Sequence, residues 1–153
     1  MLDQLSESRL SQVHPQLSRR IHNLAAAIPT ITLRVTAGIR TIAQQDALWQ
    51  LGRDAQGKKI GITVTDAKGA QSNHVLGYAA DLAVMENGQP NWKLQPWIAL
   101  APQFSLRSGL TFEDGPHLEL IEVPADPPGE VQQQYLSAGL AAVWSAANIS
   151  QTV

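Results

Sequence analysis

The sequence contains no cysteine, which excludes disulfide bonds, thiolate metal sites and a catalytic thiol. It also lacks any apolar run near the roughly 20 residues that a membrane-spanning helix needs. Basic residues form no cluster longer than a pair, and the formal net charge is −2. This charge gives no broad reason to bind nucleic acid or an anionic membrane, so we expect no nucleic-acid partner and no stable membrane association. Any metal must be held by histidine or carboxylate side chains.

The composition is that of an ordinary globular domain. Of the 153 residues, 44% are hydrophobic and 16% are charged, far from the signature of disorder. The length predicts one domain over residues 1–153, without a separate cell-wall-binding domain. The first residues, MLDQLSESRL, lack the basic segment and apolar run of a signal peptide. We therefore expect synthesis in the cytoplasm without a signal peptide.

Hydrophobic periodicity changes several times along the chain. It predicts a first helix that begins at Pro15 and ends at Pro29 and a last helix from Val131 to Trp144. A second helix is predicted to begin after Thr41, because Thr41 and Gln44 fit a capping box. Alternating patterns predict four strands: residues 31–36, 61–66, 79–85 and 118–123. The pair Asn87-Gly88 is a strong type I′ hairpin signal. Strands and helices mix without a strict βαβ order, which favours an α+β fold: a mainly antiparallel sheet flanked by helices.

Two short stretches place histidine beside aspartate. His74 precedes Asp81 in SNHVLGYAAD, and His117 follows Asp114 in EDGPHLEL. A catalytic zinc commonly takes three protein ligands and leaves a fourth position for water, and imidazole with carboxylate suits it. His74, Asp81 and His117 are therefore candidate ligands, with a turn at Gly77 that lets the chain fold back.

The chemistry of amide hydrolysis suggests further roles. A carboxylate near the metal can take a proton from the attacking water, and Asp114 is the candidate base. Glu119 is the rival base, because it shares a strand face with His117, and it is equally a candidate partner that orients this ligand. Arg40 is the best-placed cation to stabilise the charge that develops on the carbonyl oxygen.

A plainer interpretation exists for each of these residues. A histidine or aspartate in a turn is most often structural or solvated, and spacing alone leaves the metal site and the structural alternative both open. His14, beside Pro15, and His22, off the apolar stripe of the first helix, are expected at the surface.

The pattern S-x-H-x-x-G-x-A-x-D, here Ser72, His74, Gly77, Ala79 and Asp81, resembles the signature of the M15 zinc peptidases. The companion feature of that family is an acid three residues ahead of a second histidine, as in DGPH. The stretches TAGIRTIAQQDALWQLGR and VTDAKGAQSNHVLGYAADLAV are similar to the L-alanyl-D-glutamate peptidases, which include phage endolysins. The resemblance covers residues 5 to 123.

The resemblance implies a fold like that of the Hedgehog and D-Ala-D-Ala peptidases. It also implies one Zn²⁺ per chain with three ligands: His74, Asp81 and His117. By the same resemblance Asp114 acts as general base and Arg40 holds the substrate or its oxyanion. Ser72 and Gln45 take substrate-facing or supporting roles.

The implied activity is hydrolysis of the L-alanyl-D-glutamate bond in peptidoglycan stem peptides by metal-activated water, as in an endolysin that lyses a host. Such an enzyme is expected to be a monomer that acts on the periplasmic wall after release with the help of a holin. Two alternatives stay open: a D,D-carboxypeptidase or D-Ala-D-Ala dipeptidase, and a catalytically impaired wall-binding domain. The chain departs from the family pattern between Pro102 and Phe112, which bears on one wall of the cleft.

Overall fold

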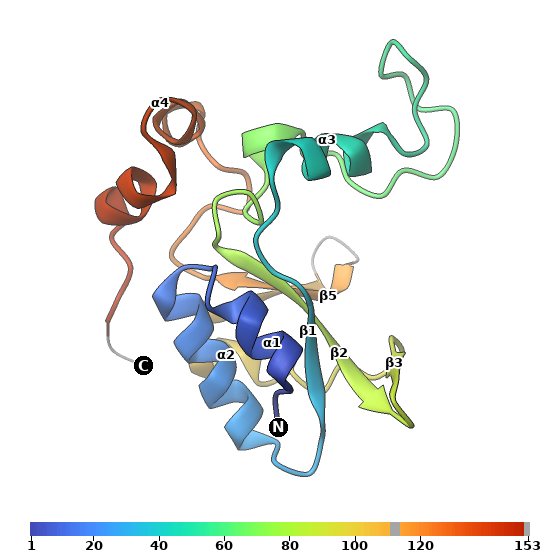
Figure 1. Ribbon diagram of the computed structural model, residues 1–153, viewed down its shortest axis with the longest axis vertical. Coiled ribbons are helices and arrows are strands. Elements are labelled where there is room, and N and C mark those ends of the chain that lie inside the picture. The colour runs from blue at the N-terminus through green and yellow to red at the C-terminus, as the bar shows by residue number, and fades with distance from the viewer. Residues whose placement is uncertain (111–113, 152–153) are drawn as a thin grey trace.

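A computed structural model describes residues 1–110 and 114–151, and it centres on one antiparallel sheet (Figure 1). The sheet contains five strands: β1 (Leu33–Ala37), β2 (Ala79–Glu86), β3 (Gln89–Asn91), β4 (Leu106–Gly109) and β5 (Asp114–Leu120). The strand order is β1-β2-β5-β4, and β3 pairs with β2 through a hairpin. The positive φ angles of Asn87 and Gly88, 51° and 78°, confirm the predicted turn.

Helices lie on one face of the sheet and beyond one of its ends. The α-helices are α1 (Gln4–Leu10), α2 (Pro15–Ala27), α3 (Ile42–Gln50) and α4 (Gly129–Ala146). Two short 3-10 helices are η1 (Gly69–Gln71) and η2 (Ala101–Phe104). Figure 1 shows α1 and α2 against the sheet, whereas α3 and α4 lie beyond the end where β2 begins. This arrangement confirms the expected α+β class with a mainly antiparallel sheet.

Local sequence explains the helices that position the rest. Pro15 opens α2, whose Leu17, Ile21 and Leu24 are completely buried against the sheet. The predicted capping box of α3 is present, because Thr41 accepts from the Gln44 backbone and the Gln44 side chain accepts from the Thr41 backbone. None of the described helices is long and apolar enough to cross a membrane.

Several expectations from the sequence were wrong in detail. Residues 61–66 form no strand. The backbone N–H groups of Ile60 and Gly61 donate to the Gly52 carbonyl, and the Thr65 carbonyl accepts from the Arg53 side chain. This segment therefore bonds to the chain just before it rather than to a second strand. Strand β5 begins at Asp114, so His117 lies within it instead of before it. His14 is buried rather than at the surface. It caps the start of α2, where its Nδ1 accepts a hydrogen bond from the Gln16 backbone N–H. His22 is partly exposed, as expected.

A buried ion pair joins α2 to the chain that follows β5. The Arg20 side chain is 0% exposed, and its two terminal nitrogens lie 2.7 and 2.6 Å from the Glu122 carboxylate oxygens. The same guanidinium donates to the carbonyls of Ser105 and Ser150. Removing the Glu122 carboxylate would leave the buried Arg20 guanidinium without its charged partner, which is costly.

Helix α4 is fastened to the turn that precedes β2. Trp144 donates from Nε1 to the Leu76 carbonyl over 2.8 Å, and the Tyr78 hydroxyl donates to the Val143 carbonyl over 3.2 Å. Between these contacts, a Cβ at Gly77 would approach the Trp144 ring to 2.7 Å, and Gly77 has φ +71°. Glycine at this position therefore permits both the turn and the close approach of the helix. The helix itself is kinked at Gly139, whose φ is 77°.

Candidate metal centre and active site

Strand pairing brings the two sequence motifs together. Asp81 on β2 lies directly opposite His117 on β5 in the antiparallel register. His74 lies on the turn before β2, and this turn closes when the Tyr78 backbone N–H donates to the Asn73 carbonyl over 2.8 Å. The turn therefore returns His74 to the strand that carries Asp81, as the glycine in the motif suggested.

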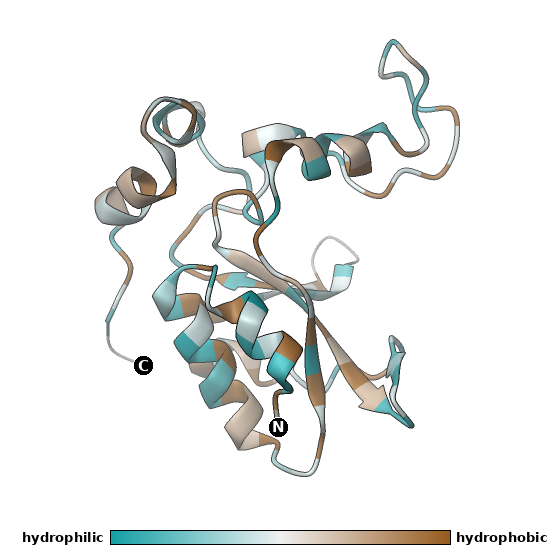
Figure 2. Cartoon of the chain, viewed as in Figure 1, coloured by the Kyte–Doolittle hydropathy of each residue, from teal (hydrophilic) through white to brown (hydrophobic). Residues whose placement is uncertain are grey.

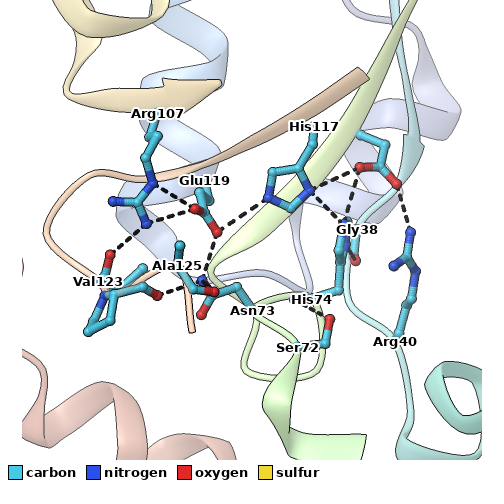
Figure 3. A network of polar contacts seen from close by, with 12 residues as sticks. Gly38, Arg40, Ser72, Asn73, His74, Arg107, His117, Glu119, Val123 and Ala125 are labelled. Atoms are coloured by element: carbon cyan, nitrogen blue, oxygen red, sulfur yellow. Dashed lines mark hydrogen bonds and ion pairs between the residues drawn. The ribbon is translucent and has the colours of Figure 1, made fainter. Parts of the chain in front are cut away.

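Three side-chain atoms from these residues converge on one point (Figure 3). His74 Nε2 lies 3.2 Å from Asp81 Oδ1 and 3.3 Å from His117 Nδ1. His117 Nδ1 lies 3.4 Å from the same Asp81 oxygen. Both imidazoles are buried, and their ring centroids are 5.1 Å apart. The structure thus brings together all three residues that the sequence suggested as ligands.

The hydrogen bonds of the outer ring nitrogens, His74 Nδ1 and His117 Nε2, determine whether the inner nitrogens, His74 Nε2 and His117 Nδ1, carry a proton or a lone pair. His74 Nδ1 lies 2.8 Å from the Gly38 carbonyl, which only accepts, so Nδ1 carries the proton. His117 Nε2 lies 3.3 Å from a Glu119 carboxylate oxygen and has the same preference. In the neutral rings, two nitrogen lone pairs and a carboxylate oxygen therefore face one another. Such a set fits a divalent cation, and the outer contacts are those that orient metal-binding histidines.

Glu119 is the centre of a second set of contacts, on the outer side of His117 (Figure 3). Only 2% of this residue is exposed, and its carboxylate accepts from Asn73 Nδ2 over 2.7 Å and from Arg107 Nε over 2.8 Å. Neither Asn73 nor Arg107 was identified from the sequence. Asn73 had one local signal, because it lies directly before His74 in the motif, whereas Arg107 belongs to the divergent segment and had none.

Arg40 connects the outer oxygen of Asp81 to α3. Its Nη2 donates to Asp81 Oδ2 over 2.7 Å, and its Nη1 lies 3.4 Å from Gln45 Oε1. The Gln45 side chain also donates to the Ala67 carbonyl over 2.9 Å, and the residue has no exposed surface. Of the two roles expected for Gln45, these contacts favour support of Arg40 over direct contact with a substrate.

Ser72 has a comparable local contact. Its hydroxyl oxygen lies 3.3 Å from the His74 backbone N–H, which donates to it. Its backbone carbonyl accepts from Val75, so the residue shapes the turn that carries His74. Ser72 also lines the cleft described below, which leaves its expected role toward a substrate as a prediction.

An open cleft of about 800 Å³ leads to the converging atoms. Asp114, the exposed first residue of β5, lies on its wall together with Arg40 and Asp126. Partial burial and the nearby Asp81 carboxylate raise the pKa of Asp114, against the opposing effect of the histidines and Arg40. A carboxyl with a raised pKa on the wall of a cleft has the properties of a proton acceptor.

The converging groups share their charge. Burial alone would lower the pKa of His117, but its contacts with Asp81 and Glu119 raise it to about 9. Burial alone would raise the pKa of Asp81, but the adjacent histidines and Arg40 lower it below its usual range. Carboxylates on both sides of His117 therefore favour a positive charge between them, whether a proton or a cation carries it.

Comparison with known proteins places this geometry in a family. The family model of the phage L-alanyl-D-glutamate peptidases matches residues 1–110. The chain belongs to this family. A curated relative, the peptidoglycan L-alanyl-D-glutamate endopeptidase CwlK of Bacillus subtilis, is 31% identical over 129 residues, 72% of this chain and 75% of that protein. These matches confirm the family resemblance and show that the protein is a peptidase of the peptidoglycan L-Ala-D-Glu endopeptidase family.

Solved structures agree on the fold of this L-alanyl-D-glutamate peptidase. The L-Ala D-Glu endopeptidase ChiX of Serratia marcescens matches with a TM-score of 0.54 and 25% identity, over 78% of this chain and 90% of that one. The vancomycin resistance D,D-pentapeptidase VanY, solved as a variant in complex with Zn(II), matches with a TM-score of 0.53 and 18% identity, over 82% of this chain and 78% of that one. The family match ends before β5, so the positions of Asp114 and His117 rest on the geometry of this chain.

Proposed function

We propose that this protein hydrolyses the L-alanyl-D-glutamate bond of peptidoglycan stem peptides and uses one Zn²⁺ held by three ligands: His74, Asp81 and His117. The observation that carries this proposal is the convergence of two imidazole nitrogens and a carboxylate oxygen within 3.4 Å at the base of a cleft. The family supplies the bond, since the related CwlK and ChiX proteins are named for it.

The donor set fits zinc because it contains two imidazole nitrogens and one carboxylate oxygen and leaves a side open to the cleft. When bound, Zn²⁺ acts as a Lewis acid and lowers the pKa of a water ligand toward about 7. The chain supplies the orientation: the Gly38 carbonyl and the Glu119 carboxylate hold the two rings with their inner nitrogens toward the ion. In this proposal Glu119 orients His117, and the alternative of Glu119 as the base is less favourable because its oxygens already accept from Asn73 and Arg107.

Asp114 is the proposed general base. Its position on the cleft wall and its raised pKa suit a group that takes a proton from the attacking water and returns it to the leaving amine. Arg40 fixes the Asp81 carboxylate and borders the same cleft, so it is also placed to hold a substrate carboxylate or a developing oxyanion. Gln45 supports Arg40, and Ser72 both shapes the turn that carries His74 and faces the cleft that receives the substrate.

The first experiment is digestion of purified peptidoglycan by the zinc-loaded protein, with a chelator control and mass spectrometry of the soluble fragments. New D-glutamate amino termini that disappear with chelator would support the proposed bond and metal together. Release of free D-alanine or of D-Ala-D-Ala would instead support the D,D-specific alternative. That alternative stays open because the D,D-pentapeptidase VanY shares this fold. A His74→Ala variant with undiminished hydrolysis would contradict the metal site.

The biological setting is part of the same proposal. A wall endopeptidase of this kind suits an endolysin that is made in the cytoplasm, reaches the periplasmic wall with the help of a holin and acts as a monomer over a single domain. The second alternative, a catalytically impaired wall-binding domain, requires that the proposed ligands and base are all present but catalyse no reaction. A measurable turnover of a soluble stem peptide would exclude it.

A further inference from the structure

The loop between α3 and η1 exposes apolar side chains that the proposed mechanism does not use. This projecting loop, residues 51–66, extends away from the sheet beyond α3 (Figure 1). Ile62 is 94% exposed, Ile60 is 70% exposed and Val64 is 61% exposed. Figure 2 shows hydrophobic positions along this otherwise polar loop. Apolar residues gathered at a surface indicate a binding function more often than isolated ones do.

The loop is internally bonded, so these side chains are held outward by a defined structure. The backbone N–H groups of Ile60 and Gly61 both donate to the Gly52 carbonyl, over 2.9 and 3.1 Å. Gly52 has φ +75°, and a Cβ there would lie 2.2 Å from the Ile62 carbonyl oxygen, so only glycine fits this crossing of the chain. The Asp54 carboxylate accepts two further backbone N–H groups within the loop.

In the projecting loop one charged side chain is buried while several apolar side chains are exposed. Arg53 is only 8% exposed, with its guanidinium donating to the Thr65 carbonyl over 3.0 Å and stacked 4.5 Å from the Trp49 ring. The charge is thus turned inward, while the isoleucines face solvent. The buried Arg53 charge is already paired with the Asp66 carboxylate. Exposing Ile60 and Ile62 to water costs free energy, and a partner that covers these side chains would offset that cost.

The loop is continuous with the cleft and opposite in charge to the rest of the chain. Residues 63–67 line the cleft wall. Between residues 48 and 71 there are four basic residues and two acidic ones, namely Arg53, Lys58, Lys59 and Lys68 against Asp54 and Asp66, in a chain of net charge −2. A partner that reaches from the cleft across this surface therefore meets apolar side chains beside exposed ammonium groups.

We propose that the projecting loop is a docking surface for the peptidoglycan polymer, which binds stem peptides next to the one being cut. Alanine methyl groups match Ile60 and Ile62, and the free carboxylate of each stem glutamate matches Lys58 in the loop and Lys68 just after it. The identity of the polymer rests on the proposed function. The loop increases affinity for the intact wall, whereas cleavage of one soluble stem depends on the cleft alone.

The test separates wall binding from catalysis. The zinc-loaded protein with Ile60→Ser and Ile62→Ser is compared with Leu136→Ser, a matched control that removes a 57% exposed leucine from α4. Binding is measured by co-sedimentation with purified peptidoglycan in an Asp114→Asn background, so that the wall is not digested. Catalysis is measured on a soluble stem peptide with Asp114 intact.

The expected result is at least about tenfold weaker sedimentation for the double variant, unchanged kcat/KM on the soluble peptide and no effect of the control. Undiminished sedimentation of the double variant would overturn the proposal. Isoleucine-dependent binding to phosphatidylglycerol vesicles, stronger than to the wall, would overturn it in favour of a lipid surface. Failure of the unmutated protein to cleave the soluble stem would contradict the proposed function, while the sedimentation comparison would still decide the role of the loop.

Discussion

The pair formed by Arg20 and Glu122 and the cluster formed by His74, Asp81 and His117 each contain buried charged or titratable side chains, and their atoms are arranged in opposite ways. At Arg20 and Glu122, guanidinium donors meet carboxylate acceptors, so opposite charges satisfy one another. At His74, Asp81 and His117, three acceptor atoms are directed at one another, and the donors lie on the outside. The first arrangement joins segments of the fold, whereas the second is incomplete until a cation or proton occupies its centre.

The largest effect should follow removal of a converging atom. His117→Ala deletes one proposed ligand, and we expect loss of stoichiometric zinc binding and of measurable wall hydrolysis, with a near-normal circular dichroism spectrum. Zinc content of the dialysed protein and fragment release from peptidoglycan measure the two losses. Full zinc occupancy in this variant would break the distinction between the two clusters.

Removal of the paired carboxylate should have the reverse outcome. Glu122→Ala leaves the completely buried Arg20 without its partner, and we expect a decrease in unfolding free energy of about 3 kcal/mol with zinc stoichiometry retained. Denaturant unfolding measures the loss. Glu130→Ala, an exposed acid at the start of α4, is the control and should change the free energy by less than about 0.5 kcal/mol.

The two clusters should also respond to pH with opposite signs in the metal-free protein. The pKa of His117 is raised from 6.5 to about 9, so its stabilising contribution is complete below pH 6.5 and is lost as pH rises through 9. The pKa of Glu122 is lowered by its hydrogen bond with Arg20, so its contribution is present above 4.5 and fades in acid.

Unfolding measured with chelator should therefore show a loss of about 1–3 kcal/mol between pH 6.5 and 9. His117→Asn should remove this alkaline decrease and leave the acid limb in place. An alkaline decrease of equal size in the Asn variant would assign it to other groups.

A smaller effect is expected from a variant that disturbs the orientation of His117 but leaves its ring in place. Glu119→Gln weakens the acceptor behind His117, and we expect zinc affinity to fall about 10–100-fold. Asp114→Asn is the matched control: it should lower kcat and leave zinc affinity nearly unchanged, because Asp114 lies on the cleft wall and outside the ligand set. Competition with a chromogenic chelator measures the affinity of both variants.

Local signals predicted much of the fold. Helix α3 and its cap, strand β2 and the Asn87-Gly88 turn each depend on neighbouring residues, and the structure agrees with them. The strand predicted at residues 61–66 failed because its alternating pattern belongs to exposed side chains of a loop. Helix α1 was not predicted, since it has only seven residues and depends on a cap at Asp3.

The candidate site shows the same division. The candidate ligands and the candidate base were suggested by two short motifs, and the register of β2 and β5 brings Asp81 and His117 together. The contacts that hold them were not predictable, because Asn73 and Glu119 are 46 residues apart and only the folded chain pairs them. Arg107, which holds Glu119, belongs to the segment that departs from the family pattern. Residues 111 and 112 of that segment lie outside the part of the chain that the structure describes.

The proposed ligand set also spans a long stretch of chain, since His74 and His117 are 43 residues apart. A bound ion would act as a reversible cross-link that closes this loop across the two central strands. Closure of a loop restricts the unfolded chain, and preferential binding to the folded state adds stability that grows with the concentration of free metal. The abundance of metal around the protein would therefore set its lifetime against heat and proteolysis as well as its activity.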